Sequence, residues 1–152
     1  MKHLKLFESF SEIESICRKY GITNYTINSD GSVDVNGDVY LSNEGLTKLP
    51  LKFNIVSGGF YCFDNKLTSL EGAPKEVGGH FDCSYNELKS LEGAPKEVGG
   101  SFDYNDNLLP KNIGHIKANI KYVIKNQDDY SIWKSDDTLD LYRFNQMMED
   151  ED

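Results

Sequence analysis

Residues 69–79 read SLEGAPKEVGG, and residues 90–100 repeat the same letters 21 positions further along the chain. The period reaches beyond this identical stretch into the flanking sequence. Glycine, leucine and valine recur at it: Gly37, Gly58, Gly79 and Gly100; Leu46, Leu67, Leu88 and Leu109; Leu49, Leu70 and Leu91; Val56, Val77 and Val98. A fixed period of roughly 20–29 residues predicts a solenoid, because one repeat cannot bury its apolar side alone whereas stacked repeats share a core. The duplication therefore predicts an architecture and no particular reaction.

The aligned repeats match the pattern of a leucine-rich coil, L-x-x-L-x-L-x-x-N-x-L, whose alternating central positions form a short strand. Its apolar and asparagine positions are filled in three repeats by Phe60, Cys62, Asn65 and Leu67, by Phe81, Cys83, Asn86 and Leu88, and by Phe102, Tyr104, Asn107 and Leu109. The first repeat has Glu44 in place of the asparagine, which suits a terminal coil. We therefore expect a leucine-rich repeat solenoid of α/β type, with about four 21-residue coils, a parallel sheet and a ladder of buried asparagines.

The segment after the last leucine of a repeat, with the core Gly-Ala-Pro-Lys-Glu-Val, returns the chain to the next strand. Pro74 and Pro95 exclude the interior of an ordinary helix, so this return segment should be extended or a short 3₁₀ turn. Such coils should be thin, with strands on one side and little helix on the other.

Length and pattern together predict one domain over residues 1–152. Its expected parts are an N-terminal helix at 1–21, a hairpin cap at 22–36, leucine-rich coils at 37–111, a helical cap at 112–148 and an acidic tail at 149–152. Ser11 and Glu14 form a capping box, and Gly21 is a helix stop. Asp30-Gly31 is the strongest hairpin signal in the chain, and we expect this hairpin to shield the open edge of the first coil.

After Pro110 the period ends, and two amphipathic helices are predicted to cover the last coil. The apolar residues of the first are Ile113, Ile116, Ile120, Val123 and Ile124. The second should begin at Asp136-Asp137-Thr138. We expect Trp133, Leu141 and Phe144 to be buried against the apolar end of the solenoid. Residues 149–152 are acidic at a helix C-terminus, where negative charge is unfavourable, so they should fray.

Composition limits the class of partner. The chain has 25 acidic and 16 basic residues, a net charge of −9, which argues against nucleic acid and anionic membrane. Solubility alone explains this charge, and so does a protein partner with a basic patch. Three cysteines, at 17, 62 and 83, lack CxxC-like spacing, so we expect no disulfide, no metal and no cofactor. The expected state is a monomer or weak homo-oligomer, and the expected location is a reducing bacterial cytoplasm, since no signal sequence or long apolar run occurs.

Residues 20–111 resemble a known family. The elements LTSLEGAPKEVGG, FDCSYNEL and YTINSDGSVDVNGDVYLSNEGLTKLPLKF look like short leucine-rich repeat proteins encoded by large tailed bacteriophages. The repeat is also similar to the proline-containing bacterial class found in secreted effectors of enteric pathogens. The resemblance implies a viral protein with a binding role in the bacterial host cytoplasm, such as host takeover or anti-defence. The Cys–His ubiquitin-ligase domain of those effectors has no room, because about 40 residues follow the repeats.

The first eight residues support two interpretations. Met-Lys-His-Leu-Lys-Leu-Phe-Glu resembles the capsid-targeting leaders of large tailed phages, whose prohead protease cuts after Leu/Ile-x-Glu. Leu6-Phe7-Glu8 fits that rule, and cleavage after Glu8 would accompany packaging into the virion. The same residues also suit a cap helix, which is the favoured interpretation.

The residues between the core positions of each strand should face outward on a concave sheet. They differ from coil to coil although the return segments are nearly identical, which is typical of a binding surface on a constant frame. The candidate binding residues are aromatic, acidic or histidine: Asp38, Tyr40, Tyr61, Phe63, Asp64, His80, Asp82, Tyr85, Asp103 and Asp106. Aromatic rings supply contact area, and carboxylates attract a cationic partner. Ordinary variation on a solvated sheet explains the same pattern, and this alternative stays open.

Catalysis is not expected. Asp82 and Asp103 on neighbouring strands would lie about 5 Å apart, a separation compatible with acid–base chemistry. However, no nucleophile–base pair accompanies them, and His80 is the only histidine expected on this face. The leading hypothesis is a non-enzymatic protein–protein interaction module of a tailed bacteriophage. The alternatives are a virion-packaged or structural protein, and an acidic decoy of nucleic-acid-binding defence proteins.

Overall fold

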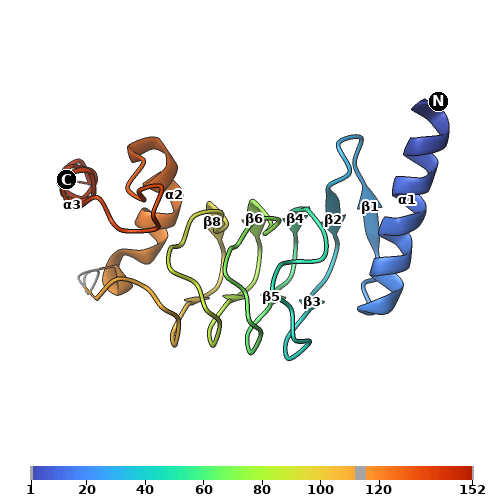
Figure 1. Cartoon of the computed structure of the whole chain (residues 1–152), viewed down its shortest axis with the longest axis horizontal. Helices are drawn as coiled ribbons and strands as arrows, with labels where there is room; N and C mark the ends of the chain where they lie inside the picture. The colour runs from blue at the N-terminus through green and yellow to red at the C-terminus, as the bar shows by residue number, and fades with distance from the viewer. Residues whose placement is uncertain (1, 112–115, 152) are drawn as a thin grey trace.

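The fold is a β-solenoid with a helix at its beginning and helices at its end (Figure 1). The computed structural model describes residues 2–111 and 116–151, with side chains from residue 9 onward. The helices are α1 at Lys2–Lys19, the 3₁₀ helix η1 at Lys117–Asn119, α2 at Ile120–Tyr130 and α3 at Leu141–Glu149. Between α1 and η1 the chain forms a stack of similar coils, as the sequence repeat predicted.

One parallel sheet runs along the solenoid in the order β3-β5-β7-β9. Its strands are Val39–Tyr40, Phe60–Tyr61, Phe81–Asp82 and Phe102–Asp103. Val39 pairs with Phe60, Phe60 with Phe81 and Phe81 with Phe102, so each turn of the solenoid brings residues 21 positions apart into register. The predicted solenoid, its period and its parallel sheet are confirmed.

The return segments form a second sheet, which goes beyond the extended or 3₁₀ link predicted for them. The order is β1-β2-β4-β6-β8, with strands at Tyr25–Ile27, Val33–Val35, Phe53–Val56, Glu76–Val77 and Glu97–Val98. In the coil that contains Pro74, the first N–H group that bonds this sheet belongs to the next residue, Lys75. It donates to the carbonyl of Asn54 (2.7 Å). The proline therefore removes no hydrogen bond from the sheet, and a strand can follow it directly.

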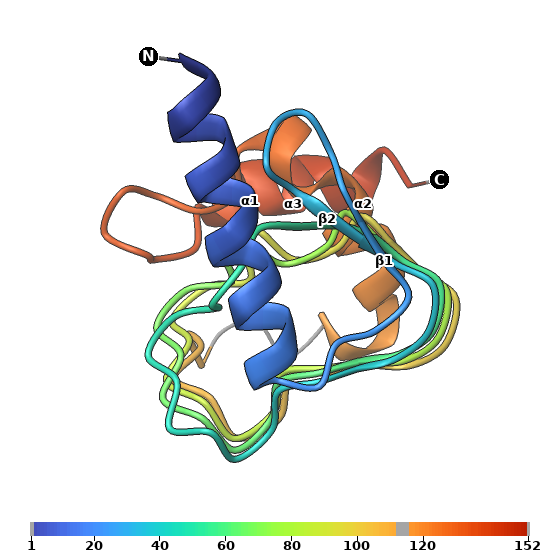
Figure 2. The ribbon, with the colours of Figure 1, turned by 90° about the vertical axis from the view of Figure 1, so that its right-hand side faces the viewer.

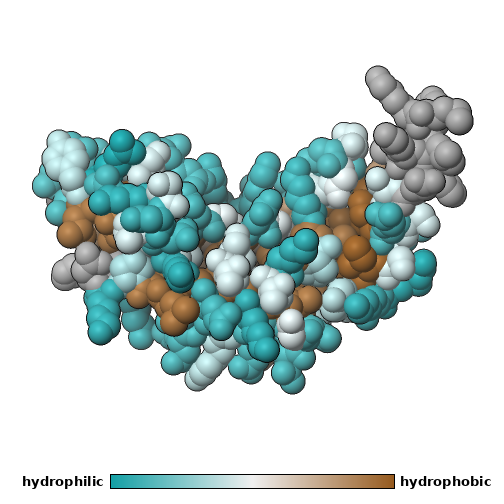
Figure 3. All heavy atoms as spheres, in the orientation of Figure 1, coloured by the Kyte–Doolittle hydropathy of each residue, from teal (hydrophilic) through white to brown (hydrophobic). Residues whose placement is uncertain are grey.

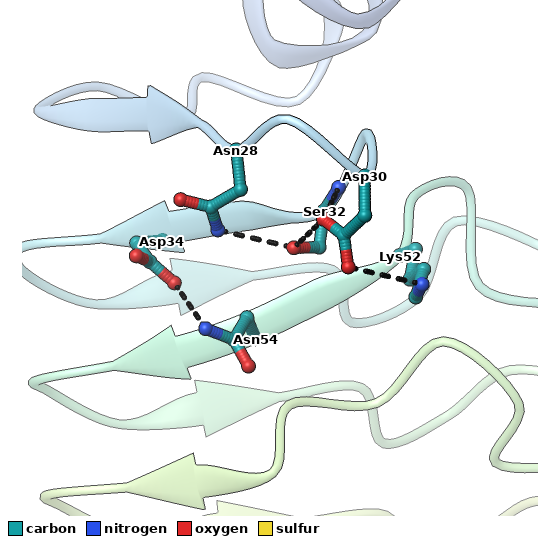
Figure 4. A network of polar contacts seen from close by, with 6 residues as sticks. All are labelled: Asn28, Asp30, Ser32, Asp34, Lys52 and Asn54. Atoms are coloured by element: carbon teal, nitrogen blue, oxygen red, sulfur yellow. Dashed lines mark hydrogen bonds and ion pairs between the residues drawn. The ribbon is translucent and has the colours of Figure 1, made fainter.

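The predicted hairpin at 22–36 is confirmed, but it extends the second sheet and not the first. β1 and β2 pair antiparallel, and β2 pairs in parallel with β4. Asp30 holds the turn, since its carboxylate accepts from the N–H and Oγ of Ser32 (3.0 and 2.6 Å), and these bonds lower the pKa of Asp30 to about 2. Figure 4 shows that Asn54 of β4 also donates to Asp34 of β2 (3.0 Å). The edge of β3, which the hairpin was expected to shield, belongs to the other sheet.

Apolar side chains of successive coils stack into one core. The rings of Phe60, Phe81 and Phe102 lie nearly parallel, with centroids 5.5 and 5.2 Å apart. Cys62 and Cys83 are fully buried beside them. Burial raises the pKa of both thiols, so these cysteines act as small apolar residues, as predicted.

The predicted asparagine ladder is confirmed. Asn86 is buried, its Nδ2 donates to the carbonyl of Cys62 in the preceding coil (3.0 Å), and its Oδ1 accepts from the N–H of Leu67 (2.9 Å). Asn65 and Asn107 make the equivalent bonds to their own preceding coils. Each amide therefore satisfies backbone groups that the sheets leave unpaired.

α1 lies across the open N-terminal end of the coils (Figure 2). It ends before Gly21, whose φ of +66° is the left-handed conformation expected of a helix stop. Cys17 and Ile22 join the core at this end. The capping-box prediction is wrong, because α1 runs without interruption through Ser11 and Glu14. Residues before Ser11 are themselves helical, so no helix N-terminus exists there for a cap to satisfy.

The C-terminal helices cover the other end of the solenoid (Figure 1). Trp133 and Phe144 are buried, as predicted. The predicted burial of Leu141 is wrong, since its side chain is 47% exposed, and Leu139 at 5% takes that place in the core. α3 also begins later than the predicted start at 136–138.

A turn before α3 explains the later start. Oδ1 of Asp136 accepts from the N–H and Oγ1 of Thr138 (3.1 and 2.5 Å), which folds this segment into a local turn. Asp140 is the actual N-cap, and its side chain accepts from the N–H of Arg143 (3.1 Å). The helix thus begins after an aspartate N-cap, Asp140, which follows the predicted start at 136–138.

The first cap helix is also displaced. η1 and α2 cover residues 117–130. Of the apolar residues predicted for it, Ile116, Val123 and Ile124 are buried, Ile120 is half-buried, and Ile113 lies outside the described residues.

Gln127 ties the cap to the solenoid. It is 1% exposed, its Nε2 donates to the carbonyl of Leu91 in the third coil (2.7 Å), and its Oε1 accepts from Nε1 of Trp133 (2.9 Å).

In the acidic tail, Asp150 is bonded by α2: the hydroxyl of Tyr130 donates to its carboxylate (2.5 Å). Asp150, which was expected to fray, is therefore held in place.

Candidate interaction surface

The outer side of the β3-β5-β7-β9 sheet and of the turns that follow its strands, which we call the strand face, carries all the predicted binding residues. The exposed ones are Asp38, Tyr40, Asp64, His80, Tyr85 and Asp106. The half-buried ones are Tyr61, Phe63, Asp82 and Asp103. Because residues one coil apart lie side by side, these side chains form rows that cross the coils.

The central row lies in strict register across the four strands. Tyr40 pairs with Tyr61, Tyr61 with Asp82, and Asp82 with Asp103. The two tyrosine rings are stacked, with centroids 5.2 Å apart and planes 7° from parallel. Parallel strands separate such neighbours by about 4.8 Å. The row therefore has an aromatic half on the first two coils and an acidic half on the next two.

Asp38 orients the aromatic half. Its Oδ1 accepts from the N–H of Gly59 (2.7 Å), and its Oδ2 accepts from the hydroxyl of Tyr40 (3.2 Å). This hydrogen bond and the nearby carboxylate charge raise the pKa of Tyr40. Gly59 gives Tyr61 its place, because a Cβ on Gly59 would lie 2.5 Å from the Tyr61 hydroxyl oxygen. Gly59 was not among the predicted binding residues. It is an outward position without a side chain, and this absence makes room for the ring of Tyr61.

The acidic half uses only part of its hydrogen-bonding capacity. Oδ1 of Asp82 accepts from the N–H and Oγ of Ser84 (2.9 and 2.5 Å). Oδ2 of Asp82 and both carboxylate oxygens of Asp103 make no hydrogen bond to a described residue. His80 makes no bond to these carboxylates. Its Nδ1 accepts from the backbone N–H of Ser101 in the next coil (2.9 Å).

A turn follows each strand, and its key residue has a positive φ. These residues are Asn43 (55°), Asp64 (54°), Tyr85 (54°) and Asp106 (57°). Asparagine and aspartate tolerate the left-handed region because their short polar side chains bond the local backbone. Backbone geometry is therefore a sufficient reason for the acidic residues of this row. Tyr85 has no such reason, and it is 58% exposed.

Ser42 was also missed by sequence reasoning. Its Oγ is buried and finds no hydrogen-bond partner among the described residues. In the third coil the equivalent Ser84 bonds to Asp82, two residues before it. In the first coil that earlier position is Tyr40, so the carboxylate that would satisfy Ser42 is replaced by an aromatic ring.

The carboxylates of the strand face have no cationic partner within 4.0 Å among the described side chains. The ion pairs among the described residues lie outside the strand face: Lys52–Asp30, Lys96–Asp128, Lys125–Glu97 and Arg143–Asp140. The strand face thus presents negative charge that no described basic side chain pairs with.

The strand face is not the hollow side of the molecule, so the expected concave shape is wrong. Figure 3 shows a hollow between the two helical ends, on the side where α1 and α2 rise beyond β4, β6 and β8 in Figure 1. β3 and β5 lie toward the opposite side. Each coil has a short strand on both of its sides. Neither side therefore spaces the coils further apart and bends the stack, as a helix on one side would. The end caps create the hollow instead.

In the described part of the chain, no three histidine, cysteine or acidic side chains are placed to hold one metal ion. None of the helices there has the length and apolarity that a membrane span requires. Comparison with known proteins identifies no relative: no protein-family model, no curated protein and no solved structure matches the chain.

Proposed function

We propose that the protein is a non-enzymatic protein–protein interaction module that binds its partner through the strand face. The proposed setting follows from the family that the sequence resembles: infection by a tailed bacteriophage, with a host or phage protein as the partner in the bacterial cytoplasm. The observation that carries the proposal is Tyr85, an exposed aromatic residue in a backbone conformation that disfavours it.

Tyr85 lowers the stability of its own turn. An ordinary residue in the left-handed region costs roughly 1–2 kcal/mol. The same turn in the other coils has Asn43, Asp64 and Asp106, so a less costly solution exists within this chain. Strain retained at an exposed position supports a functional role more than a structural one.

Tyr40 supports the same conclusion independently. An aspartate at this position would bond Ser42 as Asp82 bonds Ser84, whereas the tyrosine leaves a buried hydroxyl without a partner. Such an orphaned group costs about 1–3 kcal/mol. Aromatic side chains thus occur at two places on the strand face where the fold favours a small polar residue. Exposed tyrosines are common anchors of protein interfaces.

The proposal is tested with Tyr85→Asn in a co-precipitation from infected-cell lysate. We expect the variant to be more stable than the wild type by about 0.5–1 kcal/mol, because asparagine relieves part of the left-handed strain. We also expect it to lose the partner. The matched control is Tyr142→Asn on α3, since Tyr142 is 71% exposed but lies away from the strand face. Recovery of the same proteins by wild type and Tyr85→Asn would contradict the proposal.

Two other predictions have separate tests. A decoy of nucleic-acid-binding proteins would compete with DNA, and this competition would fall steeply with salt. Packaging into the virion would produce a chain that begins at Ser9, which mass spectrometry of purified virions detects. The bond after Glu8 lies inside α1, so the helix would have to open before a protease could cut it.

A further inference from the structure

We infer that the strand face distinguishes arginine from other cations, with the Tyr40–Tyr61 stack as the receptor for a guanidinium group and Asp82–Asp103 as the receptor for a second basic side chain. The inference rests on the proposed function and specifies the chemistry of the partner: a basic protein segment that contains arginine.

The aromatic half has the geometry that a planar cation needs. Tyr40 and Tyr61 are parallel to within 7°, and β3, which carries Tyr40, is the first strand of its sheet. One face of Tyr40 is covered by Tyr61, and the ring remains 64% exposed because no further strand continues the stack. Guanidinium groups stack on such rings as flat plates, whereas the ammonium group of lysine is a compact charge that remains strongly hydrated.

Asp38 supplies the charge beside this ring. Its carboxylate is fixed by the N–H of Gly59 and the hydroxyl of Tyr40, at 2.7 and 3.2 Å. A guanidinium on the open face of Tyr40 would have a carboxylate at its edge, where its N–H donors point. Ring and carboxylate are thus held together before any partner arrives, which reduces the entropy lost on binding.

The acidic half offers a different receptor. Asp82 and Asp103 are neighbours in the sheet, and three of their four carboxylate oxygens bond no described residue. Elsewhere on the described surface, acidic residues do form ion pairs with the chain's own lysine and arginine side chains. Because no aromatic ring belongs to this pair, it should discriminate between lysine and arginine less than the tyrosine stack does. Its centre lies two coils from the centre of the tyrosine stack, about 10 Å at 4.8 Å per coil.

Peptide binding separates the two halves. The probes are arginine and lysine homopeptides of equal length with a fluorescent label, titrated with the full chain and followed by anisotropy. We expect the arginine peptide to bind about two- to fivefold more tightly, as a cation–π contact at an exposed site would produce. Tyr40→Leu with Tyr61→Leu should remove most of this preference. Asp82→Asn with Asp103→Asn should weaken both peptides by a similar factor and preserve the preference.

Controls keep the result specific to the strand face. Tyr142→Leu removes an exposed tyrosine from α3 and should leave the preference unchanged, and a thermal melt verifies that each variant is folded. Equal affinity of the two peptides for the wild type would overturn the inference. So would a preference that is undiminished without Tyr40 and Tyr61. Either result leaves the co-precipitation test of the proposed function unaffected, because a partner can use the same face through other chemistry.

Discussion

Replacing Asn86 with alanine should destabilise the solenoid by about 1–3 kcal/mol. The Asn86 side chain is 7% exposed and bonds two groups of the preceding coil, the carbonyl of Cys62 at 3.0 Å and the N–H of Leu67 at 2.9 Å. Alanine leaves the N–H of Leu67 buried without a partner, and such a group costs about 1–3 kcal/mol. The carbonyl of Cys62 keeps its bond from Nδ2 of Asn65 (3.1 Å), and water entering the space vacated by the amide would offset part of the loss.

Urea unfolding measures this loss as a lower midpoint with an unchanged slope. Asn105→Ala is the matched control, because Asn105 is exposed and its side chain bonds no described residue. It should change the free energy of unfolding by less than about 0.5 kcal/mol. If Asn86→Ala also stayed within that limit, the asparagine ladder would not be a source of stability and the reasoning would be refuted.

Two further predictions concern the C-terminal cap. Gln127→Leu should cost about 1–3 kcal/mol, since it leaves the indole N–H of Trp133 without a partner, while the carbonyl of Leu91 keeps its bond from the N–H of Ala94 (3.1 Å). Calorimetry should show one shifted transition, and a separate early transition of the cap would contradict this. Tyr130 should titrate at about 12 by ultraviolet absorbance, because its bond to Asp150 raises its pKa, and Asp150→Asn should return the value toward the usual one of about 10. With the folded-state pKa raised, this bond stabilises the fold below pH of about 10 and is lost as pH rises through about 12; an unchanged pKa in Asp150→Asn would exclude the bond.

The architecture was predictable because the duplication fixes the register. Residues at equal places in successive repeats had to stack, which placed Asn86, Cys83 and the strand face correctly. The recurring glycine pairs allow successive coils to stack closely. A Cβ on Gly99 would lie 2.1 Å from the carbonyl oxygen of Gly78, and a Cβ on Gly78 would lie 2.1 Å from that of Ser57, so the approach of neighbouring coils leaves no room for a side chain at these two glycines.

The return strands and the ends were less predictable because their secondary structure depends on contacts between segments. Glu76-Val77 is too short to signal a strand, and it becomes one only because Val56 and Val98 pair with Val77 from either side. Leu139 and Leu141 both suit an amphipathic helix, and the turn at 136–138 decides which of them is buried.

The candidate surface was predictable in position and not in its chemistry. Alternation along the strands identified the outward residues. The positive φ at Asp64 and Tyr85 is a property of the turn, so the sequence alone could not separate a residue that suits its backbone from one that strains it. The stacking of Tyr40 on Tyr61 likewise depends on the orientation of the two rings, which the strand register alone does not fix.

Site-specific photo-crosslinking tests the central claim most directly. A photoreactive phenylalanine derivative is placed at Tyr85 or, in a second variant, at Tyr142, and each is expressed during infection. The strand face as binding surface predicts a defined crosslinked protein from position 85 and none from position 142. Crosslinks from position 142 alone would contradict the account and assign partner binding to α3.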